Sequence, residues 1–197
     1  MTTRRDFLAI AAASAQPLNF PDIGPILGAP ARHNQAFGIR TVSDGEGLTQ
    51  MRNAFDAYEI ARGEGRGTLR TAGVLYGGTS IALAFDDATW RAYRIAEALK
   101  LRADAVALDT THGNPFARGT DASIATLAAR GAAFFACNNA VEGFAKSLTA
   151  ELGLVHDPIA RVADRLRAAL LPGVTLVPAG VAAINDVQER HYTYIAV

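Results

Sequence analysis

Residues 133–144 join a buried strand, the only cysteine of the chain and the start of a helix in one continuous stretch. The apolar run Ala133–Ala136 leads into Cys137, two asparagines follow, and a helical pattern begins. In open α/β sheets, ligands bind at the edge formed by the carboxyl ends of the strands. A helix amino end carries partial positive charge and free N–H groups, which favour a thiolate. This stretch therefore predicts an α/β fold with Cys137 at the ligand-binding edge, although a free cysteine is also a common packing residue.

Strand and helix patterns alternate along the rest of the chain. Between the strands, apolar residues such as Leu48, Met51 and Phe55 recur every three or four positions, which is typical of a helix with one buried face. Strands that alternate with helices predict a mostly parallel sheet with helices on both faces. Besides the strand that leads into Cys137, short apolar segments predict strands at residues 36–42, 69–76, 174–177 and 192–197.

Capping residues predict where several helices begin. Asp86 and Asp87 can cap a helix that continues to Glu97, and Asp121 can cap a shorter one. Pro158 suits the first position of a further helix, because that position needs no backbone N–H.

Length and charge limit the possible functions. The 197 residues are 50% hydrophobic and carry 19 basic and 19 acidic side chains, which suits one α/β domain with a sizeable core. Without a basic surplus, nothing favours nucleic-acid binding. No apolar run approaches the roughly 20 residues that span a bilayer, so we expect no membrane span. A single cysteine excludes an intrachain disulfide and a zinc site made of cysteines alone.

The amino terminus has the pattern of an export signal. Arg4 and Arg5 precede a short apolar run, and the segment 13–15 (Ala-Ser-Ala) has the small-x-small form of a cleavage site. The Thr-Arg-Arg-x-Phe-Leu core resembles a twin-arginine (Tat) signal. We therefore expect residues 1–15 to be a Tat-type signal cleaved near Ala15, which would place the protein in the periplasm. An ordinary amphipathic amino terminus is the alternative.

The remaining chain divides into two parts. Residues 16–34 contain four prolines among small residues and are expected to form a linker or an extended arm without a regular helix. Residues 35–197 are expected to form the α/β domain.

Several polar or glycine residues are candidates for binding a ligand near Cys137. Gly77 and Gly78 follow the second strand, and Asn138 and Asn139 follow Cys137 itself. Gly77 and Gly78 are equally consistent with a tight turn that approaches a neighbouring backbone.

A polar loop adds two further candidates. His112 and Asn114 lie in the glycine- and proline-containing loop 110–120, where side chains can line a site or simply face solvent.

Four segments carry a resemblance to a known family: Phe134–Ala140 (FFACNNA), Leu171–Val174 (LPGV), Val177–Val181 (VPAGV) and Tyr192–Ile195 (YTYI). Together they resemble the DsrE/DsrF-like family of intracellular sulfur-oxidation proteins, in particular exported members with a Tat signal. The resemblance covers roughly residues 35–197 and includes Asp87, Trp90, Tyr93 and Asn114-Pro115. Where the subgroup usually has glycine before its final strand, this chain has His191.

The resemblance implies a three-layer α/β/α domain around a five-stranded parallel sheet, assembled as homo- or hetero-oligomers, often trimers or hexamers. In family members that relay sulfur, a cysteine carries it as a persulfide, and Cys137 lies in the matching region. With no second cysteine, transfer would need a thiol on a partner protein. We expect no cofactor.

Two other interpretations of Cys137 stay open. In the first, the protein is a non-catalytic, oligomeric periplasmic protein that binds a small ligand, and Cys137 is a packing residue. In the second, Cys137 and one of the four histidines hold a metal, although no paired spacing favours this and we expect no metal.

Overall fold

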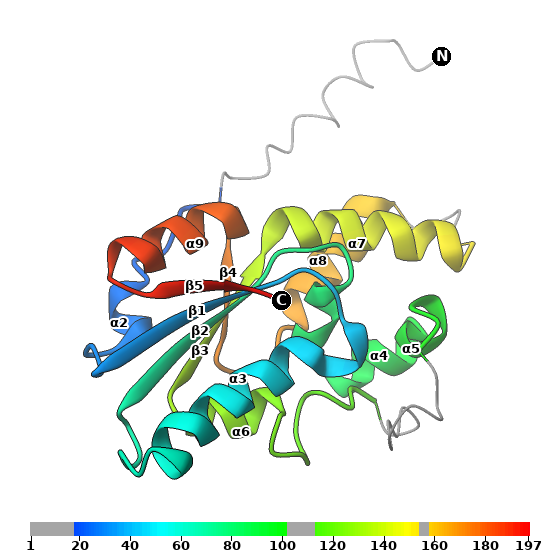
Figure 1. The fold of residues 1–197 in the computed structure, drawn as a ribbon. Helices are drawn as coiled ribbons and strands as arrows, with labels where there is room; N and C mark the ends of the chain where they lie inside the picture. The colour runs from blue at the N-terminus through cyan, green and yellow to red at the C-terminus, as the bar shows by residue number, and fades with distance from the viewer. Residues whose placement is uncertain (1–17, 102–112, 154–157) are drawn as a thin grey trace, which may run out of the picture.

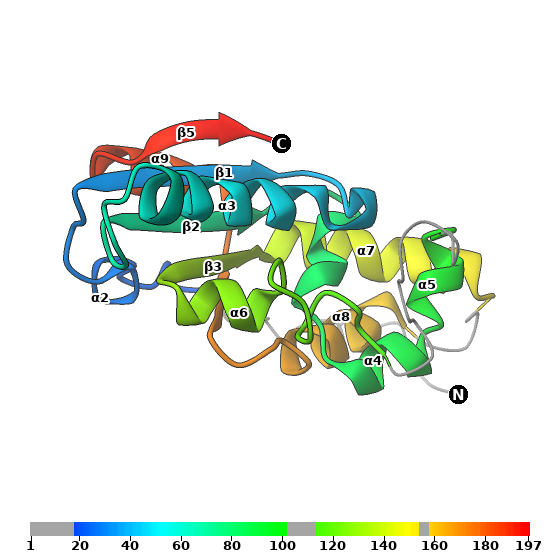
Figure 2. The same cartoon turned by 60° about the horizontal axis from the view of Figure 1, so that its bottom comes forward.

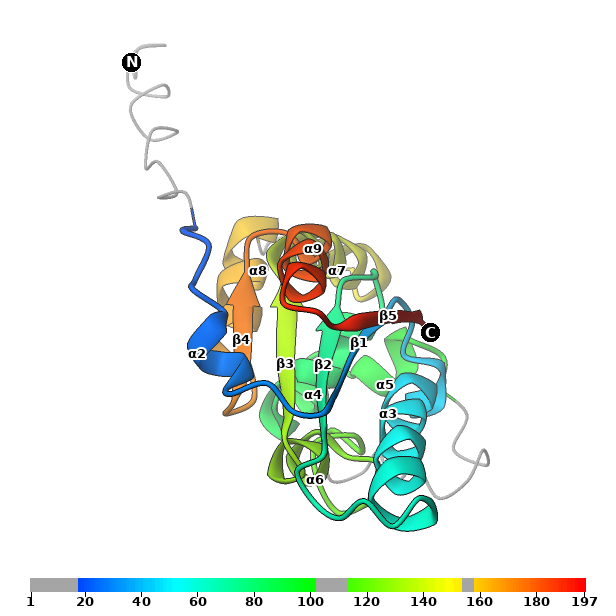
Figure 3. The same cartoon turned by 60° about the vertical axis from the view of Figure 1, so that its left-hand side comes forward.

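The computed structural model describes residues 18–101, 113–153 and 158–197. The predicted signal at residues 1–15 lies outside these ranges. Within the described residues, the strands form one five-stranded sheet in the order β4-β3-β2-β1-β5, and every neighbouring pair is parallel (Figure 3). The strands are β1 (His33–Ile39), β2 (Leu69–Leu75), β3 (Ala132–Cys137), β4 (Val174–Val177) and β5 (Thr193–Ala196).

Helices cover both faces of the sheet (Figure 1). On one face lie α3 (Glu46–Asp56), which continues as a π-helical turn, and α6 (Ile124–Ala129). On the other lie α9 (Gly180–Glu189) and the one-turn helix α2 (Gly24–Leu27). Because both faces are covered, β3 is buried along its whole length. The expected three-layer α/β/α architecture is confirmed for the described residues.

The order of the strands explains why α9 lies on its own face. From β1 to β4 each strand pairs with the next in sequence, whereas the chain must cross the whole sheet to reach β5 beside β1. Crossover connections between parallel strands are right-handed, so a connection that runs back across the sheet lies on the opposite face. The chain leaves β4 and enters α9 at Gly180, which brings the start of this helix to the carboxyl ends of the strands.

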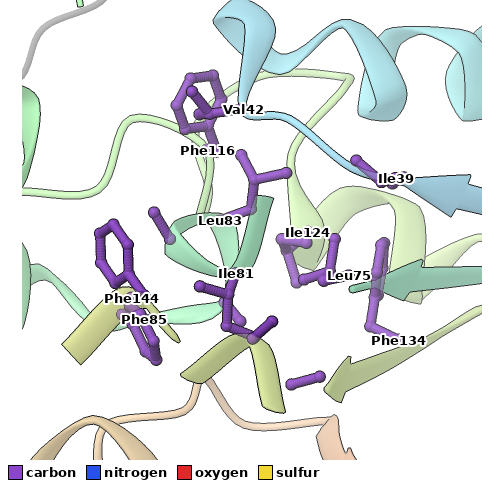
Figure 4. Packing of buried hydrophobic residues seen from close by; sticks show 14 of the residues in the cluster. Ile39, Val42, Leu75, Ile81, Leu83, Phe85, Phe116, Ile124, Phe134 and Phe144 are labelled. Carbon is purple, nitrogen blue, oxygen red and sulfur yellow. The ribbon is translucent and has the colours of Figure 1, made fainter. Parts of the chain in front are cut away.

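A second group of helices gathers beyond the carboxyl ends of the strands, which we call the carboxyl edge (Figure 2). Figure 4 shows the apolar side chains that fill this region, with the rings of Phe85 and Phe144 stacked at a centroid separation of 6.0 Å. The Trp90 indole donates a hydrogen bond to the carbonyl oxygen of Ala82 at 2.9 Å. The group consists of the 3₁₀ segment Ser80–Ala84, α4 (Asp87–Ala92), α5 (Ile95–Ala98), α7 (Asn138–Glu151) and α8 (Ile159–Ala168).

The structure corrects the expectation for residues 16–34. The described part of this segment includes α2, with its proline in the first turn, where no backbone N–H is required. Ile23 and Leu27 are buried against the α9 face of the sheet, and β1 begins at His33 rather than at residue 36, because residues 33–35 pair with the start of β2. This segment is therefore partly built into the fold.

Two other local expectations were wrong. The helix expected to run from Asp87 to Glu97 breaks into α4 and α5, because Arg94 adopts a left-handed conformation with φ of 46°. Helix α6 is capped by Ser123, whose hydroxyl accepts from the N–H of Thr126, while the expected cap Asp121 pairs with an arginine of α3. Local sequence could not show that Ser123 rather than Asp121 caps α6, because Asp121 pairs with an arginine that is distant in the sequence.

A third expectation was off by one position. Pro158 precedes α8 as its cap residue rather than occupying the first helical position.

No helix in the described part of the chain is both long and apolar enough to cross a membrane.

We expect Gly77→Ala to lower the free energy of unfolding by about 1–3 kcal/mol, because a Cβ there would overlap the Arg40 carbonyl and overpack the site. Gly78→Ala is the matched control: nothing lies within 4 Å of its Cβ position, and we expect a change of less than about 0.5 kcal/mol. Urea denaturation measures both. Equal stability of the two variants would contradict the close approach of Gly77 to Arg40.

Candidate functional site

Cys137 lies at the carboxyl edge, as expected. It is the last residue of β3, is paired in register with Val177 at the end of β4, and immediately precedes α7. Helix α9 begins three residues after Val177, so the amino ends of α7 and α9 come together beside neighbouring strands. Neither helix start is capped by a described side chain. Their first N–H groups have no partner within their own helices and point towards this edge.

Cys137 is nevertheless covered. Only 4% of its surface is exposed. A Cβ built on Gly180 would overlap the Cβ of Tyr76 and lie 3.1 Å from the Cβ of Cys137. Tyr76 directly follows β2, and Gly180 is the first residue of α9. The start of α9 therefore packs closely against Tyr76 and against the Cβ of Cys137, and only glycine at position 180 permits this approach.

Tyr76 is hydrogen-bonded to a second tyrosine at the same edge. The hydroxyls of Tyr76 and Tyr194 lie 3.3 Å apart, and Tyr194 lies over Gly38 of β1, where any side chain would overlap its hydroxyl. The hydrogen bond with Tyr76 and partial burial raise the pKa of Tyr194 to about 12, against the opposing effect of the Arg40 charge. We call Cys137, Tyr76, Gly180 and Tyr194 the cysteine site.

The two asparagines after Cys137 differ in their surroundings. Asn138 is buried, and both ends of its amide are engaged: its Oδ1 accepts from Arg167 Nε at 2.8 Å and its Nδ2 donates to Glu142 at 3.0 Å. Arg167 also pairs with Glu142 at 2.7 Å, so Asn138 ties the start of α7 to α8. Asn139 is exposed on the first turn of α7. Of the two, only Asn139 is free to meet a ligand from solvent.

The two glycines of the turn after β2 have different surroundings. Gly77 fits against the Arg40 backbone and exchanges hydrogen bonds with the Ser80 hydroxyl, which makes it a turn residue. Gly78 is exposed and lines a cavity of about 200 Å³ between this turn, α5 and α7. Leu99 and Phe144 form part of its apolar wall, and Cys137 does not line it. The residues expected to form one ligand-binding site therefore do not do so: Cys137 is buried, and Gly78 lines a cavity that Cys137 does not reach.

The expected loop candidates do not join the cysteine site. Asn114 is buried, donates to the carbonyl oxygens of Leu83 and Phe85, and accepts from the N–H of Phe116 at 2.9 Å. It holds its loop against the core rather than facing a ligand. His112 lies outside the described residues.

The two described histidines do not support the metal interpretation. His33 at the start of β1 contacts Glu64 at 2.9 Å, and His191 precedes β5, so both lie near the amino ends of strands, away from Cys137. Among the described side chains, no group of three His, Cys, Asp or Glu residues is arranged to hold a metal ion.

Sequence reasoning missed Tyr76, Tyr194 and Gly180. A signal for Tyr76 was present, because it follows β2 directly and neighbouring parallel strands end at the same edge. Tyr194 comes from the far end of the chain, and its pairing with Tyr76 depends on β5 lying beside β1. Gly180 begins α9, and its role as the point of close approach depends on where that helix packs.

We expect Gly180→Ala to lower the free energy of unfolding by about 1–3 kcal/mol, because the added Cβ overlaps Tyr76 and crowds Cys137. The matched control is Gly143→Ala in α7, where nothing lies within 4 Å and alanine stabilises a helix by up to about 1 kcal/mol. Thermal unfolding of both variants tests this. If Gly180→Ala is as stable as the parent protein, the packing described for the cysteine site is wrong.

Because Tyr194 is hydrogen-bonded to Tyr76, we expect its phenol to ionise at a higher pH than an ordinary tyrosine. We expect Tyr194 to ionise at about pH 12 and to titrate closer to its ordinary value of 10.0 in Tyr76→Phe, which removes the hydrogen bond. Because the folded-state pKa is raised, the associated stability is present below pH 10 and is lost as the pH rises towards 12. Spectroscopic titration of the tyrosines, with Tyr194→Phe to assign the step, measures it. An unchanged late step in Tyr194→Phe would refute the assignment.

Comparisons with known proteins give no family. No family model matches the chain, and no curated protein matches it. Among solved structures, the chain is similar to a protein of unknown function from Methanobacterium thermoautotrophicum, with a TM-score of 0.44 and 16% sequence identity. The match covers 84% of this chain and 99% of the other.

Proposed function

We propose that the protein is a single-cysteine sulfur carrier of the DsrE/DsrF-like type, in which Cys137 holds one sulfur atom as a persulfide. The observation that carries the proposal is the position of the only thiol at the carboxyl edge, where the uncapped starts of α7 and α9 meet. Two helix amino ends stabilise negative charge on a thiolate and on the terminal sulfur of a persulfide alike.

The chemistry is an exchange between sulfur atoms without net oxidation. The Cys137 thiolate attacks the outer sulfur of a donor persulfide, RS–SH. A new S–S bond forms on Cys137, the S–S bond of the donor breaks, and the donor leaves as the thiolate RS⁻. In the second step, a thiolate on a partner protein attacks the outer sulfur on Cys137, and the Cys137 thiolate is regenerated. No second cysteine of this chain is required.

The cover over Cys137 fits a carrier that works outside the cytoplasm. An unpaired thiol in an oxidising compartment is exposed to oxidation, and a cysteine with 4% exposure is sheltered from it. Tat-dependent export to the periplasm and assembly into trimers or hexamers belong to the same proposal. Val181, 65% exposed at the start of α9, offers an apolar contact for a partner beside the site.

Burial also favours a second candidate, a non-catalytic protein that binds a small ligand. In this case Cys137 is a core residue, and the ligand occupies the cavity of about 200 Å³ beside Gly78. Its wall includes the apolar side chains of Leu99, Phe144 and Leu148, with Thr79 as a polar group. The two candidates differ in whether Cys137 reacts in the folded protein.

The carrier is tested by mass spectrometry of the folded protein after incubation with a low-molecular-weight persulfide. We expect a mass increase of about 32 Da, one sulfur atom, that is removed by a thiol acceptor. Cys137→Ser must lack the increase, since it removes the only thiol.

Denatured protein gives the positive control, because it exposes the thiol fully. Sulfur uptake by denatured but not by folded protein would overturn the carrier and leave the ligand-binding candidate.

A further inference from the structure

A second cavity lies near the amino ends of the strands, away from Cys137. It has a volume of about 200 Å³ and is lined by α2 and by the turn between α9 and β5. In Figure 1, α2 lies at the end of the sheet opposite α7. The lining residues of the cavity are Gly24, Leu27, Gly28 and Pro30 from the first segment, and Arg190 and Tyr192 from the second.

Arg70 lies beside this cavity without lining it, and it adds a second positive charge to the region. It lies near the start of β2, and its guanidinium group packs about 4 Å from the Cβ position of Gly28 on the cavity wall. The side chain is half-buried, and it has no acidic or hydrogen-bonding partner among the described residues. A partly desolvated arginine without a counter-charge is unfavourable unless an anion from solution fills that role.

Tyr192 supplies a hydrogen-bond donor at the same place. The residue is 6% exposed and its hydroxyl has no partner among the described residues. Burial raises the pKa of Tyr192, although the nearby charge of Arg70 acts in the opposite direction, so the phenol keeps its proton at neutral pH. Arg70 and Tyr192 are thus a cation and a donor that lack partners.

Arg190 is the third polar group. One of its nitrogens lies 3.5 Å from Asp22, and another donates to the Asp186 carbonyl at 3.2 Å. The Asp22 carboxylate also accepts from the N–H of Gly24. Asp22 offsets the charge of Arg190, and the charge of Arg70 beside the cavity is left without a counter-charge among the described residues.

We infer that this cavity binds a small oxyanion, a carboxylate or a phosphate, through Arg70, Arg190 and the Tyr192 hydroxyl. A planar guanidinium forms paired hydrogen bonds with either class of anion, and a protonated phenol adds a third donor. A volume of about 200 Å³ has room for an anion without bulky groups. The site is independent of the proposed sulfur chemistry, because it lies near the start of β2 and Cys137 lies at the end of β3.

Isothermal titration calorimetry at constant ionic strength tests the site, with inorganic phosphate in one arm and acetate in the other. We expect saturable binding of at least one anion at concentrations up to about 10 mM, a range that covers millimolar affinity. Binding in only one arm identifies the class of anion, and absence of binding in both arms overturns the inference.

Variants distinguish specific binding of the anion in this cavity from nonspecific attraction of the anion to basic side chains. Arg70→Gln and Arg190→Gln are expected to weaken binding by about tenfold or more, and Tyr192→Phe by less. Arg66→Gln removes the same charge from an exposed turn and is expected to bind like the parent protein.

Circular dichroism confirms that each variant is folded. Because two arginines contribute, a folding defect in one variant leaves the other as a test. Equal losses in Arg66→Gln and the site variants would also overturn the inference.

Discussion

The contact between the start of α9 and the ends of β2 and β3 is the constraint on which the carboxyl edge depends. Gly180 can lie against Tyr76 and Cys137 only because it has no side chain. This contact exists because the chain must return from β4 at one edge of the sheet to β5 at the other, and α9 makes that crossing. The same crossing brings Tyr194 beside β1 and within reach of Tyr76. One topological requirement therefore both builds the cysteine site and covers its thiol.

Much of the fold follows from local patterns. The four residues of β4 and the strand that ends at Cys137 were predicted almost to the residue, since both are short apolar runs with clear boundaries. Predictions failed where two local signals competed or where distant residues decided the result. Asp121 was expected to cap α6, but Ser123 caps it. Ile23 and Leu27 are buried against the sheet, although the prolines around them favoured an extended arm. His191 has φ of 65°, a conformation that glycine adopts more readily, and no local pattern predicted it there.

The candidate site could be predicted only in part. The position of Cys137 follows from a strand–helix boundary, which is local information. Its exposure depends on Tyr76 and Gly180, which come from two other connections and meet Cys137 only in the folded sheet. For the same reason Asn114 was a candidate for binding a ligand, although its amide is hydrogen-bonded within the core. The cavity beside α2 could not be predicted from the sequence, because its lining residues come from two distant segments. Residue type and spacing indicate which groups can react, whereas the packing of distant segments decides which are accessible.

The central claim is that Cys137 is covered but reacts within the folded protein, and native-state alkylation measures this most directly. The rate of alkylation is followed by mass spectrometry as urea is increased below the unfolding transition. If Tyr76 and the start of α9 move aside locally, Cys137 is alkylated more slowly than in unfolded protein. Its alkylation rate is then nearly independent of urea at low urea concentrations. A rate that follows the global free energy of unfolding over the whole range would show that Cys137 reacts only after the protein unfolds, and would contradict the claim.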